Sequence, residues 1–140
     1  MLSLGTARAL KEAGLVWSPA QFDFFTIPER GMDERVFVIS DMPAGLSQIL
    51  GQPVVAFEGA GEWALDYVAR GEVVWLPTED QLRGLLAARF AGEPGRLLTL
   101  STRAGWCRCE IELDGQPLVF EAADGGQAYG DALLHVLRQP

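Results

Sequence analysis

The feature that most constrains this chain is a pair of alternating apolar stretches joined by an Asp-Gly dipeptide. "WCRCEIEL" precedes Asp114 and Gly115, and "QPLVFEA" follows them. Two such residues between alternating runs are a strong indication of a β-hairpin with a tight turn. In that register the pairs beyond the turn, such as Cys109 with Phe120, keep apolar opposite apolar. The sequence therefore predicts both a hairpin and its register.

Alternation along the first of these strands separates two sets of side chains. Trp106, Arg108 and Glu110 share one face, and the cysteines share the other. Trp106 is the one aromatic residue that this pattern places on the polar face. Either a helix covers it, or it is uncovered, and an uncovered aromatic next to an arginine is a typical interface anchor. Trp106, Arg108 and Glu110 are thus the predicted interaction surface.

Both cysteines of the chain, Cys107 and Cys109, lie on the other face of this strand. A disulfide between them would span about 6.6 Å of Cα separation, near the geometric limit. A metal would need two further ligands, and the single histidine of the chain is His135. We expect both cysteines to pack in the core as small apolar side chains, without metal or redox chemistry.

Pro117 adds information about the order of the strands. It opposes Glu112 in a non-hydrogen-bonded pair, so its missing N–H would point away from the hairpin. This position suits an edge strand. The cysteine strand would then lie inside the sheet, with "RLLTLST" as its other neighbour.

Four helices and several further short strands are predicted elsewhere. Ser3 is a plausible N-cap of a first helix that ends at Gly14, and residues 61–71, "GEWALDYVARG", have helical periodicity. Thr78 with Gln81 forms a capping box, and Asp124 with Gln127 forms a second capping pair. Short strands are expected between residues 19 and 28, at 35–39, after residue 52 and before residue 77, whereas residues 44–51 give no clear pattern.

The predicted architecture is a single α+β domain that spans residues 1–140. Its sheet is expected to be largely antiparallel, with the C-terminal β-hairpin and flanking helices on at least one face. A chain of 140 residues has the size of one domain. No linker or internal repeat divides it.

Charge and hydropathy argue against several classes of partner. The net charge is −8 and the chain has a single lysine, so it lacks the cationic footprint that nucleic acid or an anionic membrane would need. No apolar run approaches the ~20 residues of a membrane helix, and the first residues do not resemble a signal peptide. Few cysteines without such a signal favour a reducing compartment. We expect a cytoplasmic protein.

Catalytic motifs are weak throughout. Gly59 and Gly61 give half of a dinucleotide fingerprint and are better interpreted as a turn, and no phosphate-binding loop with lysine occurs. Asp131 and His135 are expected to form a surface i,i+4 pair. The acidic pairs, Asp33 with Glu34 and Glu58 with Glu62, fit solvated loops. We expect no catalytic residue, cofactor or metal, and binding rather than catalysis.

Three segments carry a resemblance to known proteins: "MDERVFVISDM", "GEWALDYVARGEVVWLPTEDQLRGLL" and "FEAADGGQAYGDALLHVLR". They resemble a family of short, uncharacterised bacterial proteins, some of which are titled pilus assembly protein. The chain has no phosphate-binding loop with lysine, which an ATPase would need, and the resemblance implies no catalytic residues. The last hairpin and helix are also similar to small phage-encoded α–β–α sandwich proteins, which implies a fold and no activity.

Three functions remain open from the sequence. The first is a small cytoplasmic interaction or regulatory module that binds a protein partner or a second copy of itself. The second is a small-molecule-binding protein or enzyme, with a pocket of Trp17, Trp63 or Trp75 and an acidic group. The third, which follows only from the resemblance, is a pilus or secretion accessory protein.

Overall fold

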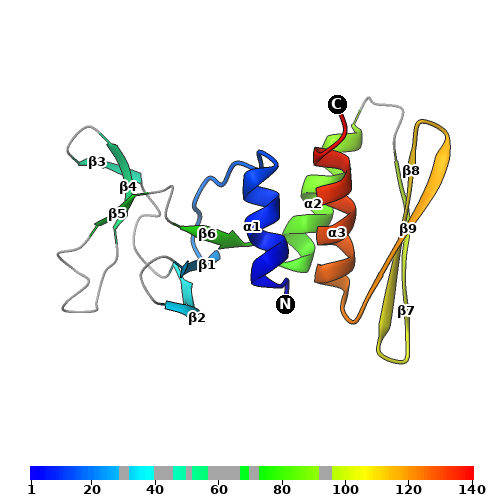
Figure 1. Ribbon diagram of the computed structural model, residues 1–140, viewed down its shortest axis with the longest axis horizontal. Coiled ribbons are helices and arrows are strands. Elements are labelled where there is room, and N and C mark those ends of the chain that lie inside the picture. The colour runs from blue at the N-terminus through cyan, green and yellow to red at the C-terminus, as the bar shows by residue number, and fades with distance from the viewer. Residues whose placement is uncertain (29–31, 40–45, 50–51, 57–66, 70–72, 92–95) are drawn as a thin grey trace. The chain divides into compact units, whose positions relative to one another are not determined.

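The computed structural model describes residues 1–28, 32–39, 46–49, 52–56, 67–69, 73–91 and 96–140 (Figure 1). Contacts within the chain gather in two compact units, one formed by Met1–Leu15 with Pro77–Pro140 and one by Val16–Leu76. Among the described residues every strand pair is antiparallel, and the same residues also form helices. The α+β class and the antiparallel pairing are therefore confirmed, while the single domain over 1–140 stays a prediction.

The unit that contains both chain ends is built on a three-stranded sheet in the order β7-β8-β9. Its strands are β7 (Arg96–Arg103), β8 (Trp106–Leu113) and β9 (Gln116–Ala122). Asp114 and Gly115 turn with φ of 52° and 77°, left-handed values that asparagine, aspartate and glycine adopt most readily. The pairing of Cys109 with Phe120 is as predicted. The hairpin, its register and the central place of β8 are confirmed.

The described residues of this unit also form three helices: α1 (Leu4–Glu12), α2 (Glu79–Phe90) and α3 (Gly125–Leu137). Each begins at an N-cap side chain that accepts a backbone N–H of its first turn. The predicted capping box is present: the Thr78 side chain accepts from Gln81 N, and Gln81 Oε1 accepts from Thr78 N at 2.9 Å. The starts of all three helices are therefore encoded locally, as the sequence predicts.

Helix α3 lies in the middle of this unit. It packs on β8 and β9 along one side and against α1 and α2 along the other (Figure 1). Leu133 and Ala132 are buried, and so are the small residues Gly126 and Gly130, which face Leu2 at the start of the chain. Because α3 is covered by the sheet and by helices, it can be apolar around most of its circumference.

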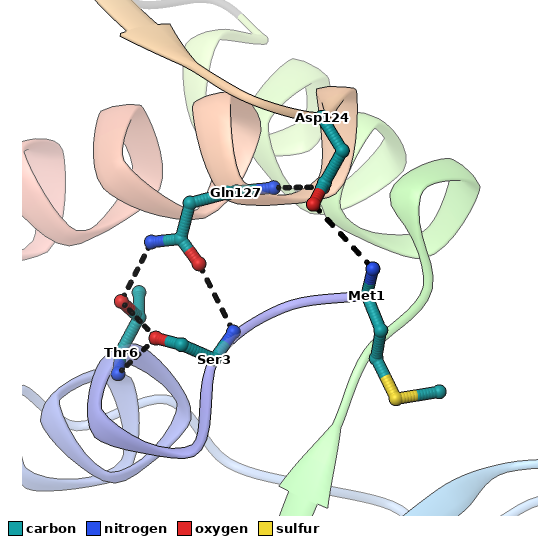
Figure 2. A network of polar contacts seen from close by, with 5 residues as sticks. All are labelled: Met1, Ser3, Thr6, Asp124 and Gln127. Carbon is teal, nitrogen blue, oxygen red and sulfur yellow. Dashed lines mark hydrogen bonds and ion pairs between the residues drawn. The ribbon is translucent and has the colours of Figure 1, made fainter. Parts of the chain in front are cut away.

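A polar network joins the beginning of α1 to the beginning of α3 (Figure 2). Gln127 Oε1 accepts from Ser3 N at 3.0 Å, and Gln127 Nε2 donates to Thr6 Oγ1 at 2.7 Å. Asp124 caps α3 by accepting from Gln127 N at 2.9 Å, and its Oδ2 lies 3.5 Å from the Met1 ammonium. The predicted capping pair is therefore half right, because the Gln127 side chain bonds to α1 instead of to its own N-cap.

The second unit, Val16–Leu76, contains two three-stranded sheets among its described residues. One has the order β2-β1-β6, with β1 in the middle, and the other has the order β3-β4-β5. Their strands are β1 (Phe24–Ile27), β2 (Met32–Val38), β3 (Leu46–Ile49), β4 (Gln52–Ala56), β5 (Tyr67–Ala69) and β6 (Val74–Leu76).

The helix predicted over residues 61–71 is wrong at β5. Tyr67, Val68 and Ala69 form a strand that pairs with β4, while residues 61–66 and 70–71 lie outside the described residues. The spacing of apolar residues favours a helix here, but tyrosine and valine also have a high preference for strands. Pairing with the antiparallel strand β4 selects the strand.

Candidate interaction surface

Helix α3 covers one face of the β7-β8-β9 sheet and leaves the other face open. Alternation on β8 places Cys107 and Cys109 toward α3, and Trp106, Arg108 and Glu110 on the opposite face, here called the outer face. The helices of this unit pack on the cysteine side (Figure 1). The three predicted residues are therefore brought together on the outer face of the central strand.

Trp106 is uncovered: 59% of its surface is exposed. Of the two alternatives that the sequence left open, a helix over Trp106 and an open aromatic, the structure has the second. Large aromatic side chains bury 150–250 Å² when they are covered, so an open tryptophan leaves much apolar surface in water. Among the described residues Trp106 is the one exposed tryptophan, which makes it the strongest anchor candidate on this face.

The guanidinium of Arg108 is held beside Trp106 by two carboxylates. Arg108 Nη2 lies 2.7 Å from Glu110 Oε1, and Nη1 lies 3.8 Å from Glu121 Oε1 on the neighbouring strand. All three side chains are partly exposed, so these pairs add little to stability. Their effect is to orient Arg108, because a side chain with two partners loses less freedom when a ligand binds.

The outer face is hollowed around Trp106. The hollow has a volume of about 290 Å³ and is lined by Ser101, Arg103, Trp106, Cys107, Arg108 and Glu121. Arg103 has no ion-pair partner among the described residues, so its charge is available to a ligand. The hollow thus combines the apolar ring of Trp106, two arginines and the carboxylate of Glu121.

Of the predicted surface residues, Trp106 and Arg108 line this hollow and Glu110 does not. The sequence prediction did not include four of the lining residues: Ser101, Arg103, Cys107 and Glu121. The register contains the signal that could have found all of them but Cys107. Ser101 of β7 and Glu121 of β9 both pair with Arg108. Arg103 pairs with Trp106 across the turn at Ala104 and Gly105, which joins β7 to β8. Cross-strand partners share a face, so a complete register predicts Ser101, Arg103 and Glu121 on the outer face, whereas Cys107 belongs to the other face of β8.

The cysteines are core residues, as predicted. Both are free and buried, and Cys109 is fully covered beneath α3. Burial raises the pKa of the Cys109 thiol from 9.0 to about 11, which makes its thiolate scarce at neutral pH. In the part of the chain that the structure describes, no three metal-ligating side chains come together.

The Asp131–His135 surface pair is not how these residues are arranged. Asp131 Oδ1 accepts from Gln127 Nε2 at 2.8 Å, and the His135 ring lies 5.6 Å from the ring of Phe120. His135 Nε2 is also 3.3 Å from Gln139 Nε2. Asp131 belongs to the polar network of α1 and α3, and the His135 ring packs on Phe120 of β9.

Two of the tryptophans named for a small-molecule pocket are part of the core of the second unit. Trp17 is buried, stacks on Trp75 with ring centroids 6.3 Å apart, and donates its Nε1–H to Asp23 Oδ2 at 2.8 Å. Phe25 and Ile27 of β1 belong to the same cluster. The acidic group near these rings is thus already bonded to one of them. Trp63, Gly59, Gly61, Glu58 and Glu62 lie outside the described residues.

No protein-family model, curated protein or solved structure matches this chain. The resemblance to the proteins titled pilus assembly protein stays a prediction. None of the described helices is both long and apolar enough to cross a membrane.

Proposed function

We propose that this chain is a small protein-interaction or regulatory module that binds a protein partner through the outer face of β7-β8-β9. The observation that carries the proposal is Trp106, an exposed tryptophan on a central strand with an orientated arginine beside it. Interfaces concentrate their binding energy in a few residues, among which tryptophan, tyrosine and arginine are enriched.

The arrangement of the surface supports binding over catalysis. Arg103 and Arg108 flank an apolar ring, while Glu110 and Glu121 restrain one of them. Hydrolytic and group-transfer sites need a nucleophile or a base with a perturbed pKa. Cys107 is the one thiol among the residues that line the hollow, and its side chain belongs to the buried face of β8. A partner that places an apolar side chain on Trp106 would find this surface already formed.

The test compares two outer-face variants with two matched controls. Trp106→Ala removes the anchor, and Arg108→Ala removes the orientated cation. Phe22→Ala removes another exposed aromatic residue, and Arg83→Ala removes another exposed arginine with an ion pair, to Asp80 on α2. All four alter exposed side chains, so each variant should retain the stability of the parent within about 0.5 kcal/mol.

Affinity-tagged versions of the five proteins would be purified gently from the host, and native mass spectrometry would give the mass of each complex. Each co-purified protein would then be produced separately and titrated against all five. We expect Trp106→Ala to weaken binding about thirtyfold, as for a hot spot worth ~2 kcal/mol, with both controls unchanged. A complex that contains only two copies of the chain would identify a homodimer. Partners that bind Trp106→Ala and Arg108→Ala as tightly as the parent would overturn the proposal.

A further inference from the structure

The register of the hairpin decides which backbone groups of β9 remain free. In a hairpin with a two-residue turn, the pair next to the turn exchanges hydrogen bonds, and every second pair beyond it does the same. Gln116, Leu118, Phe120 and Ala122 therefore direct their N–H and C=O groups to β8. Pro117, Val119 and Glu121 direct theirs to the opposite side, away from the hairpin.

That side of β9 is an open edge. Among the described strands, β8 is the only neighbour of β9, and no backbone bond is formed by Val119 or Glu121 on the free side. Pro117 has no N–H and closes the end of the edge nearest the turn to strand pairing. The usable edge is thus short and is confined to Val119 and Glu121.

The same two residues also place their side chains on the outer face. Val119 pairs with Glu110 and is 42% exposed, which is high for a valine within a sheet. Glu121 pairs with Arg108 and lines the hollow beside Trp106. Residues 119–121 of β9 therefore combine free backbone groups with an exposed apolar side chain and a carboxylate.

The opposite edge of the sheet is less suited to pairing. The register of β7 on β8 shifts between Leu97 and Thr99, and α2 contacts β7. A bulge re-aims the backbone groups of an edge strand and is one of the devices by which proteins prevent pairing there. The β9 edge shows no such shift.

From these observations we infer that the partner contributes an extended segment, which adds to β9 as an antiparallel fourth strand of the sheet. This inference rests on the proposed function, because it specifies how the partner engages the outer face. In such a pairing Val119 and Glu121 each exchange both backbone bonds with the residue opposite. Those two opposite residues would also lie on the outer face.

Charge and polarity define the segment. Glu121 is 55% exposed, and its nearest cation, Arg108, is bound more closely by Glu110, at 2.7 Å against 3.8 Å. The whole chain carries −8, which favours a basic ligand. A lysine or arginine would fit opposite Glu121, and an apolar residue opposite Val119. Since the strands run antiparallel, the residue opposite Glu121 comes first in the segment. From its N-terminal end, the segment would therefore have a basic residue, then any residue, then an apolar residue.

A second copy of the chain fits this edge poorly. The residues of β9 that face outward are Pro117, Val119 and Glu121, so in a β9–β9 pair Glu121 would oppose one of these three. None of these residues is a cation. Pro117 lacks an N–H, and Glu121 opposite Glu121 would bring two carboxylates together. Two chains of net charge −8 would also repel each other.

The experiment uses peptides selected from a phage-displayed library of random linear sequences on the full chain. Val119→Pro removes the free N–H of the edge, and Pro117 shows that the strand accepts proline at an outward-facing position. Val119→Thr keeps both the N–H and the β-branched shape, so it is the matched control. Glu121→Lys tests the charge, and Trp106→Ala tests the surface itself. Circular dichroism and the retained exchange protection of the Phe120 amide would show that each variant is folded.

We expect enriched peptides to contain the basic-x-apolar pattern and to bind Val119→Pro at least tenfold more weakly than the parent, with Val119→Thr within threefold. Bound peptide should slow amide exchange at Val119 and Glu121 at least tenfold, and Glu121→Lys should weaken basic peptides. Peptides that bind Val119→Pro normally, or that leave both amides unprotected, would overturn strand addition. If these peptides still bind Trp106→Ala more weakly than the parent, the proposed function survives.

Peptides whose affinity falls with Val119→Pro but not with Trp106→Ala would support strand addition and would show that Trp106 is not part of the binding surface. A failure to enrich any peptide would count against both.

Discussion

Gly130 is the position at which one methyl group tests the packing of α1 on α3. A Cβ atom at Gly130 would overlap Leu2 Cδ1 and would lie 3.5 Å from Thr6 Cγ2. Leu2 is buried, so its side chain has little room to move away. Gly84, in the middle of α2, offers the matched control, because a Cβ there meets nothing within 4 Å.

The comparison of the two substitutions isolates the clash. Replacing glycine by alanine inside a helix adds about 1 kcal/mol of stability through helix propensity, and this gain is common to both sites. Overpacking of a buried site costs about 1–3 kcal/mol. Gly84→Ala should therefore stabilise the protein by up to about 1 kcal/mol, and Gly130→Ala should be about 1–3 kcal/mol less stable than Gly84→Ala.

Urea unfolding followed by circular dichroism at the helical band is the appropriate assay. All helices among the described residues belong to the unit of Met1–Leu15 and Pro77–Pro140, so this signal follows the part of the chain that contains both sites. Midpoints compared at a common slope give the difference in unfolding free energy. Equal stabilisation by the two variants would refute the packing of Leu2 on α3.

A double variant sharpens the result. Leu2→Ala removes the Cδ1 atom that the new methyl group would overlap, so in that background Gly130→Ala should recover the helix-propensity gain. Contacting residues commonly show coupling of about 0.5–3 kcal/mol, whereas distant ones are additive. Additive effects of Leu2→Ala and Gly130→Ala would show that the two residues do not touch.

Three further predictions concern the helix starts and the buried thiol. Thr78→Ala should lower the free energy of unfolding by about 1 kcal/mol in a urea titration, because it removes the acceptor of Gln81 N–H, and Thr78→Ser should not. Gln127→Ala should cost about 1 kcal/mol in the same titration by releasing Ser3 N–H and Thr6 from α3, and a neutral result would contradict that link. Burial raises the Cys109 pKa from 9.0 to about 11, so the folded state holds this proton more tightly than the unfolded state. Stability should therefore fall as the pH rises from 9 toward 11, and the loss should be smaller in Cys109→Ala.

The parts of the fold that the sequence predicts well are those that neighbouring residues determine. The Asp114-Gly115 turn sets the hairpin register, and Thr78 sets the start of α2, because each involves bonds between residues only a few positions apart. Gln127 shows the limit of this reasoning. Its side chain was equally suited to its own N-cap, but Ser3, distant by 124 residues in sequence, is bonded to it instead.

Strand β5 shows a second limit. Residues 61–71 have helical periodicity, yet Tyr67, Val68 and Ala69 pair with β4. Periodicity measures which residues could share a face, and it does not include the hydrogen bonds that a neighbouring strand offers. Strand β3, Leu46–Ile49, was not predicted for the same reason, since it is defined by its pairing with β4.

The sequence predicts which residues share the outer face, but it does not predict whether that face is exposed. Alternation groups Trp106 with Arg108 and Glu110, and it does so correctly. Whether Trp106 is open depends on where the helices pack, and that is decided by the other face, on which Cys109 and Ile111 are fully buried. An aromatic residue on a polar face fits a covered or an open surface, so strand pattern alone cannot choose.

Core and surface are therefore linked on β8. Because the side-chain period of a strand is two, the register that buries Cys109 and Ile111 under α3 is the one that exposes Trp106 and Arg108. The same register carries over to β9, where it directs the free backbone groups of Val119 outward and places its side chain on the outer face. A slip of one residue would bury Trp106 and expose the cysteines, so selection for a packed core also keeps the outer face and the open edge in place.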